Sequence, residues 1–178
     1  MVCTFKRENV TSLNRRFGFI GPQNVKNNFS ISVRTLYKAF LMLEKNLWQQ
    51  LSRALKRDKW PYVRIEATAA GIPDVLVADR DGRLHLIELK MVRGSKIKLS
   101  PHQVSFLTRF SKTGASVWIL ARRERPMPEY FLFYGSAAIA LAQGSIDEPG
   151  QLLPVVLETG SALPWSSIKT ALVTAQNV

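Results

Sequence analysis

The stretch Gly71–Lys90, GIPDVLVADRDGRLHLIELK, decides the fold of this 178-residue chain. Two apolar runs, Val75–Ala78 and Leu84–Ile87, are joined by a turn that contains Asp81-Gly82, a pattern typical of a β-hairpin. Because both runs are apolar on both faces, we expect them to lie inside a covered sheet.

The register of this hairpin follows from its turn. With Arg80–Gly82 as a three-residue loop and its glycine in the left-handed conformation, Val75 lies opposite Ile87 and Asp74 lies opposite Glu88. Opposed residues project from the same face of a sheet, with Cβ atoms roughly 5 Å apart. A slip of one residue would separate the two carboxylates, so the interpretation depends on this register.

Lys90 is two residues beyond Glu88 and shares its face. Charged groups inside a covered sheet are costly unless they are paired or bind a metal. Two adjacent carboxylates are best accommodated by a divalent cation between Asp74 and Glu88. The structural alternative is a salt-bridged cluster in which Lys90 pairs with one of them.

Composition limits the class of protein. The hydrophobic fraction of 46% predicts a globular chain. A single cysteine, Cys3, excludes an intramolecular disulfide and fits a reducing compartment. We see no signal peptide and no membrane-length apolar run, so we expect a cytoplasmic protein, in the host cytoplasm if phage-encoded. His85 and His102 are isolated, and we interpret them as a packed strand residue and a helix-surface residue rather than as zinc ligands.

The net charge of +12 is uneven. Residues 1–64 carry 13 Lys and Arg against 3 acids, and residues 65–125 carry 11 against 6, whereas residues 126–178 carry 1 against 4. A polyanionic partner, most commonly nucleic acid, is the natural interpretation, and a merely solvated surface is the alternative.

Three segments are expected. Residues 1–35 form a basic arm that includes Arg15 and Arg16; its interspersed phenylalanines either stack on bases or dock on the core or a second subunit. Residues 36–125 form the core, and residues 126–178 form an acidic extension packed on it.

In that extension we expect an edge strand at Tyr130–Tyr134, a short helix at Ser136–Gln143, a loop-like segment up to Pro164, and a closing helix at Trp165–Ala175.

Periodicity supplies the core elements. Apolar residues at three- and four-residue steps predict a helix over Leu36–Arg57, in which Lys45 lies off the apolar stripe and Glu44 falls within it. That glutamate is either paired with a basic group or directed at a site. Alternation predicts a half-buried strand over Pro61–Ala67, with Glu66 a further acid near the site.

After the hairpin we expect a basic loop, Met91–Leu99, whose Arg93, Lys96 and Lys98 are placed to contact phosphates. Ser100-Pro101 then begins a helix, with Gln103 as the polar residue of an apolar face that also contains Phe106, Leu107 and Phe110. Ser116–Ala121 is a buried strand, and the run Arg122–Pro126 ends the core. The order of elements predicts an α/β fold with a central mixed sheet flanked by helices.

The ordered set Glu44, Pro73-Asp74, Glu88-Leu89-Lys90 and Gln103 resembles the PD-(D/E)XK nuclease superfamily, and the flanking pattern is similar to its small VRR-Nuc and Holliday-junction-resolvase-like members. The resemblance covers residues 40–123 and implies a restriction-endonuclease-like core.

The resemblance also implies roles. Asp74 and Glu88 would bind Mg²⁺ or Mn²⁺ with the main-chain carbonyl of Leu89, and Glu44 would contact a metal or its waters. Lys90 would orient or activate the attacking water, and Gln103 would support Lys90 or a phosphate. Glu66 has no counterpart, so its role is open.

We therefore expect a metal-dependent nuclease that hydrolyses DNA, an endonuclease acting on duplex or branched DNA in recombination or repair. A junction enzyme would act as a homodimer. The alternatives are an exonuclease or a nicking nuclease, a nucleic-acid-binding module with a vestigial site, and an accessory protein whose C-terminal residues bind a partner.

Overall fold

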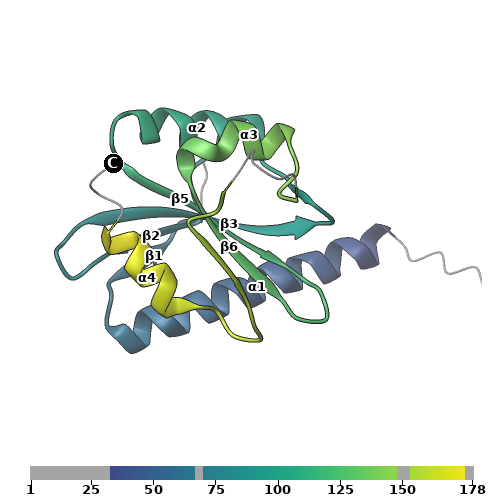
Figure 1. Ribbon diagram of the computed structural model, residues 1–178, viewed down its shortest axis with the longest axis horizontal. Helices are drawn as coiled ribbons and strands as arrows, with labels where there is room; N and C mark the ends of the chain where they lie inside the picture. Colours follow the sequence, from purple (N-terminus) through teal and green to yellow (C-terminus); the bar gives the residue numbers. More distant parts are fainter. Residues whose placement is uncertain (1–32, 67–69, 148–152, 175–178) are drawn as a thin grey trace, which may run out of the picture. The chain divides into compact units, whose positions relative to one another are not determined.

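A seven-stranded mixed sheet runs through the computed structural model, which describes residues 33–66, 70–147 and 153–174, with side chains of the first helix from residue 43 (Figure 1). The spatial order of the strands is β1-β2-β3-β5-β6-β7, and β4 pairs with β3. Only β3 and β5 run parallel; the other pairs are antiparallel. The strands are β1 Tyr62–Arg64, β2 Val75–Ala78, β3 Leu84–Arg93, β4 Lys96–Ile97, β5 Ser116–Arg123, β6 Glu129–Tyr134 and β7 Val156–Thr159.

Helices cover both faces of the sheet (Figure 1). Helices α1 (Val33–Asp58) and α4 (Trp165–Thr174) pack on one face through a core cluster that includes Leu47, Leu51 and Trp165. Helix α2 (Pro101–Lys112), the 3₁₀ turn η1 (Gly135–Ala137) and α3 (Ala138–Gln143) cover the other face through Leu107, Ala138 and Leu141. The predicted α/β architecture with helices flanking a mixed sheet is confirmed.

The register of the hairpin is as predicted. Val75 pairs with Ile87 in the β2–β3 ladder, and the next step toward the open end places Asp74 opposite Glu88. Gly82 has a φ of 76°, the left-handed conformation that the turn requires. The Asp79 carboxylate closes the turn by accepting hydrogen bonds from the main-chain amides of Asp81 (2.8 Å) and Arg83 (2.9 Å).

Most helix predictions are confirmed. The helix over Leu36–Arg57 is found as α1, and its predicted face is buried at Leu47, Leu51 and Ala54. Ser100 caps α2 and Pro101 begins it. The prediction is wrong for one residue of the α2 face: Phe110 is 41% exposed and stacks on Phe106, with ring centroids 4.0 Å apart.

The structure corrects the strand next to the hairpin. Only Tyr62–Arg64 of the predicted half-buried strand Pro61–Ala67 pairs with β2, and none of the three is buried, with Val63 59% exposed. Because β1 is the edge of the sheet, one of its faces has no helix to cover Val63.

The predicted basic loop Met91–Leu99 is largely a second hairpin. Strand β3 continues to Arg93, turns at Gly94 with a φ of 59°, and returns as β4, with Arg93 opposite Lys96. Val92 and Ile97 point into the core, which stabilises strands in a segment whose basic residues suggested a loop.

The C-terminal part also differs from expectation. Arg122 and Arg123 do not end the core: they belong to β5 and are 5% and 6% exposed, because the carboxylates of Glu124, Glu129 and Asp147 pair with them. Strand β6 is interior rather than an edge, and the edge is β7, which lies in the segment expected to be a loop. The short helix and the closing helix are confirmed as η1 with α3 and as α4.

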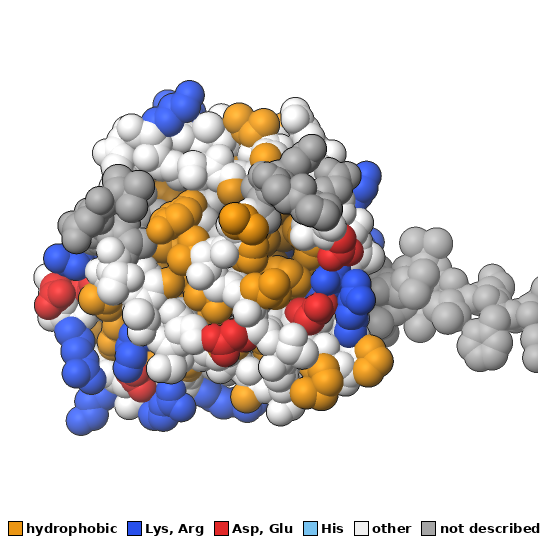
Figure 2. Space-filling model, viewed as in Figure 1, with side chains coloured by type: hydrophobic (Ala, Val, Ile, Leu, Met, Phe, Trp, Pro, Cys, Tyr) orange, Lys and Arg blue, Asp and Glu red, His pale blue; other side chains and the backbone are white. Residues whose placement is uncertain are grey.

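Lys and Arg side chains gather along the lower edge of the view in Figure 2, over the C-terminal half of α1, where exposed basic residues include Arg53, Lys56, Arg57 and Lys59. Residues 1–32 of the predicted basic arm, with Arg15 and Arg16, lie outside the described residues, and its residues 33–35 belong to α1. No described helix combines the length and apolar character needed to cross a membrane.

Candidate active site

The site is built at the open end of the β2–β3 hairpin. Asp74 lies directly before β2, and its Oδ2 accepts a hydrogen bond of 2.8 Å from the amide of Leu89 on β3. Its main-chain carbonyl accepts a second bond of 2.8 Å from the amide of Ile65, just after β1. Three segments of chain thus fix the position of this carboxylate.

Glu88 is at the centre of the cluster and is fully buried. Its Oε1 contacts two donors, the Nζ of Lys90 at 2.7 Å and the Nε2 of Gln103 at 2.5 Å. Its Oε2 is also buried and has no hydrogen-bond partner among the described residues. A buried carboxylate oxygen without a partner is energetically costly, so this atom is poised to accept a ligand.

Gln103 is positioned by the way in which α2 begins. Its main-chain amide donates to Ser100 Oγ (3.2 Å), and its side-chain Oε1 accepts from the Ser100 amide (2.9 Å), which together form a capping box. The other end of the same amide is then free to donate to Glu88. The helix start therefore fixes the side chain that holds the buried carboxylate.

Gly71 allows α2 to approach the loop that leads to Asp74. Its φ is +95°, and a Cβ at this position would lie 2.6 Å from the main-chain oxygen of His102. Only glycine fits both the conformation and the contact. His102 itself is exposed, and the prediction of a helix-surface histidine is confirmed.

Burial and neighbouring charges shift the pKa values of the acids in the cluster. The pKa of Glu88 is raised to about 7, first by burial and then by the Asp74 charge, while Lys90 opposes the shift. The pKa of Glu44 on α1 is also raised, first by burial and then by Asp74, while Lys90 and Arg64 lower it. Glu44 is thus within electrostatic range of the cluster, as its place on the apolar face of α1 suggested. Strong perturbation of this kind is typical of functional sites.

A family profile described as archaeal Holliday junction resolvase (hjc) matches residues 45–139, more than half of the chain. The chain belongs to the archaeal Holliday junction resolvase family. It is therefore a nuclease of the PD-(D/E)XK type, as the sequence motifs suggested. No curated protein matches the sequence.

The segment matched to the resolvase family includes Asp74, Glu88, Lys90 and Gln103. Glu44 lies one residue before it, and β7 and α4 lie beyond its end. The structure brings the four matched residues together, while their catalytic roles stay predictions.

The carboxylates of this resolvase-family site fit a divalent cation. Asp74 and Glu88 face each other, and Glu88 Oε2 is a buried acceptor without a partner. In the described parts of the chain, no three His, Cys, Asp or Glu side chains are grouped as a metal site, so Glu44 does not complete a three-acid set. The predicted ligand set thus relies on the Leu89 carbonyl and on water, which suits a hard cation such as Mg²⁺.

The candidate DNA-contacting residues of the described chain are exposed. Arg93, Lys96 and Lys98 are exposed on and just after the β3–β4 hairpin, and Lys45 is exposed on α1 beside Glu44. Glu66 is exposed and lies in no helix or strand, so its role stays open.

Sequence reasoning missed two features. One is the pair Trp48 and Arg64, which come from α1 and β1 and meet near Glu44. The signal was present as an aromatic and a basic residue, but only the packing of α1 against β1 brings them together. The other is the bonding of His85: this buried strand residue, predicted to be packed, contacts Ser116 Oγ (2.7 Å) and Asp79 Oδ2 (3.4 Å).

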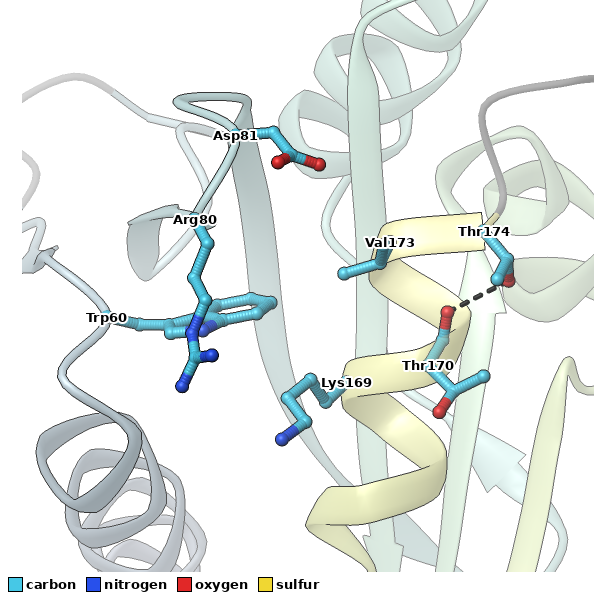
Figure 3. Close-up of a pocket in the computed structure, with 7 residues that line it drawn as sticks. All are labelled: Trp60, Arg80, Asp81, Lys169, Thr170, Val173 and Thr174. Carbon is cyan, nitrogen blue, oxygen red and sulfur yellow. Dashed lines mark hydrogen bonds between the residues drawn. The ribbon is translucent and has the colours of Figure 1, made fainter.

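A separate pocket of about 380 Å³ lies at the turn of the hairpin, between that turn and α4 (Figure 3). Figure 3 shows the Arg80 side chain extending in front of Trp60, while Lys169 projects from α4 on the other side of the pocket. The pocket contains none of the residues of the catalytic cluster.

Proposed function

We propose that this chain is a metal-dependent endonuclease that cuts branched DNA, and that Asp74, Glu88 and Lys90 carry out the hydrolysis. The observation that carries the proposal is the burial of the Glu88 carboxylate and the set of side chains that contact it. It is buried opposite Asp74, held through Oε1 by Lys90 and Gln103, and left without a partner at Oε2.

Phosphodiester hydrolysis needs an aligned water nucleophile and compensation for negative charge that develops on the phosphate. Asp74 and Glu88, with the Leu89 carbonyl, are the groups that would hold Mg²⁺ or Mn²⁺. When bound, such an ion lowers the pKa of water and neutralises phosphate oxygens.

The chain's own residues supply the remaining functions. The Lys90 ammonium, 15% exposed, is close enough to the surface to reach a water and a phosphate oxygen while it bonds to Glu88. Gln103 keeps Glu88 in one orientation. Glu44 adds negative charge at the edge of the cluster, which favours a cation there.

DNA is proposed as the substrate because exposed basic residues follow the catalytic residues along the chain. Lys45 follows Glu44, and Arg93, Lys96 and Lys98 follow Lys90, so these four can contact phosphates. Branched DNA is proposed because the chain belongs to a family described as Holliday junction resolvases. Symmetric cleavage of a four-way junction requires two equivalent sites, so we propose a two-fold dimer acting in the cytoplasm.

The test is cleavage of end-labelled duplex, single-stranded, flap and four-way junction DNA by the pure protein with Mg²⁺, Mn²⁺ or EDTA. We expect cleavage of the junction with either metal and none with EDTA. Asp74→Ala, Glu88→Ala and Lys90→Ala should abolish cleavage while binding in a mobility-shift assay is retained.

Lys112→Ala is the matched control for Lys90→Ala, because Lys112 is an exposed lysine at the end of α2. It should cleave like the wild type. Cleavage by all three site variants at the wild-type rate, or DNA binding without cleavage of any substrate by the wild type, would refute the proposal. The second result would favour a binding module with a vestigial site.

A further inference from the structure

A cleft of about 280 Å³ lies between α1 and β1, and its Glu44 is within electrostatic range of Asp74 and Lys90. It is lined by Glu44, Lys45, Trp48, Gln49 and Arg64. A cleft of this volume can admit a single planar group such as a nucleobase but not a duplex.

Three side chains form a stack at this cleft. The Tyr62 ring packs edge-on against Trp48, with ring centroids 5.7 Å apart and an interplanar angle of 73°. The guanidinium of Arg64 packs over the Trp48 ring, with its Cζ 5.2 Å from the ring centroid. Tyr62 is half-buried and packs on the core, so the stack has a fixed base.

Arg64 is the outer member of the stack and is exposed. Among the described residues it has no ion-pair partner, and its close contact is with Trp48. An arginine plane held on an aromatic ring offers a flat cationic surface, and such surfaces stack on nucleic-acid bases.

The cleft is coupled to the catalytic cluster through Glu44 and through the main chain. Glu44 lines the cleft and interacts electrostatically with Lys90, Asp74 and Arg64. Arg64 pairs with Val75 in the sheet, one residue from Asp74, and the amide of Ile65, just after β1, donates to the Asp74 carbonyl. A group bound in the cleft would therefore contact Glu44 and the strand whose end is hydrogen-bonded to Asp74.

We propose that the Trp48–Arg64 stack binds an unstacked base at the branch point of the DNA, with Lys45 contacting the phosphate beside it. This inference rests on the proposed nuclease function and names what its site recognises. In continuous duplex each base is covered by its neighbours. At a branch point the stack is interrupted, and a base face becomes available to the Arg64 plane.

The pocket at the hairpin turn is less suited to this role (Figure 3). Its Trp60 is 3% exposed, so the ring offers no free face, and its Lys169 already pairs with Asp58 at 2.7 Å. Arg80 in that pocket is nevertheless an exposed arginine beside a tryptophan, far along the hairpin from Asp74, and so provides a matched control.

The test compares Arg64→Ala, Arg64→Lys and Arg80→Ala on a four-way junction and on an uninterrupted duplex of equal length. Binding is measured in EDTA, and cleavage in Mg²⁺ is resolved into kcat and KM. Because loss of base stacking weakens binding by about tenfold or more, both Arg64 variants should weaken junction binding to that extent and duplex binding less than twofold. Arg64→Lys keeps the charge, so its defect isolates the planar stack, and Arg80→Ala should match the wild type.

A direct readout is the fluorescence of 2-aminopurine placed at the branch point, which is quenched by stacking. The wild type in EDTA should quench it, and Arg64→Ala should leave it bright. Equal loss of junction and duplex binding, or unchanged quenching with Arg64→Ala, would overturn the inference. If junction DNA is cleaved but Arg64 variants behave like the wild type, only this inference fails. If no DNA is cleaved, the proposed function fails, and the quenching in EDTA still shows whether the cleft binds a base.

Discussion

Gln103 donates a hydrogen bond of 2.5 Å to the buried Glu88 carboxylate from a side chain whose other end accepts from the Ser100 amide that caps α2. One amide thus joins the start of a helix to the centre of the catalytic cluster. Since Glu88 has a single remaining side-chain partner, Lys90, its orientation depends on the position of α2.

Replacing Gln103 should therefore slow catalysis more than it destabilises the fold. Gln103→Ala removes half of the capping box and the bond to Glu88, which should lower the free energy of unfolding by about 1–2 kcal/mol. Single-turnover cleavage should fall by about tenfold or more, with little change in DNA affinity, because the carboxylate loses its orientation. Ser100→Ala is the control: it removes the cap but leaves the Glu88 bond. If Ser100→Ala slows cleavage as much as Gln103→Ala, the helix cap and not the Glu88 contact explains the effect.

The metal-free protein should become less stable as the pH rises through the titration of Glu88. Its pKa is raised from 4.5 to about 7, so the folded state binds this proton more tightly than the unfolded state. The contribution of Glu88 to the free energy of unfolding is most favourable below about pH 4.5, falls between pH 4.5 and 7, and is fully lost above. A shift of this size corresponds to at most about 3 kcal/mol.

Comparison of the wild type with Glu88→Gln isolates the contribution of Glu88. The comparison is needed because burial lowers the pKa of His85, and this shift makes the protein more stable as the pH rises. In urea unfolding with EDTA, the variant should match the wild type near pH 4 and exceed it at pH 8. Adding Mg²⁺ at pH 8 should then stabilise the wild type and not the variant. Equal stabilisation of both proteins by Mg²⁺ would show that Glu88 does not bind the ion.

The parts of this fold that sequence predicts are those fixed by local chemistry. The left-handed Gly82 and the alternation around it set the register that opposes Asp74 to Glu88, and Ser100-Pro101 sets the start of α2. Glu44 stands out because an acid within an apolar stripe is unusual at any position of a helix.

The parts that sequence misses depend on partners far along the chain. Arg123 carries a charged side chain of the kind usually found at the surface, but it is buried because Glu129 and Asp147 pair with it. The exposure of Val63 depends on β1 being an edge strand, which no local pattern encodes. The Trp48–Arg64 stack requires α1 to cross the sheet beside β1.

Gly71→Ala should disrupt the site through the backbone. The new Cβ would need the left-handed conformation at φ +95° and would lie 2.6 Å from the His102 carbonyl oxygen, so the start of α2 has to move away. Left-handed strain alone contributes about 1–2 kcal/mol, and we expect a larger loss of stability together with slower cleavage as Gln103 is displaced.

Gly82→Ala is the matched comparison, because its φ is +76° and a Cβ there meets nothing within 4 Å. Gly82→Ala should lower the free energy of unfolding only by the cost of the left-handed conformation, and the folded variant should cleave DNA at the wild-type rate. Chemical denaturation and single-turnover cleavage measure both effects. Similar behaviour of the two variants would mean that the contact with His102 is readily relieved.

Deleting residues 126–178 should abolish folding rather than remove a dispensable extension. Strand β6 lies between β5 and β7, and Tyr130, Leu132 and Phe133 are at most 1% exposed. The deletion also removes α3 and α4, one from each face of the sheet, and the Tyr130 hydroxyl that donates to Gln50 of α1 (2.9 Å). A chain ending at Arg125 would expose β5 as a long apolar edge, which favours aggregation. Circular dichroism and urea titration should show no cooperative transition for it, whereas a chain ending at Thr174 should unfold like the full-length protein. A cooperative, DNA-cleaving 1–125 fragment would instead show that these residues serve a partner rather than the fold.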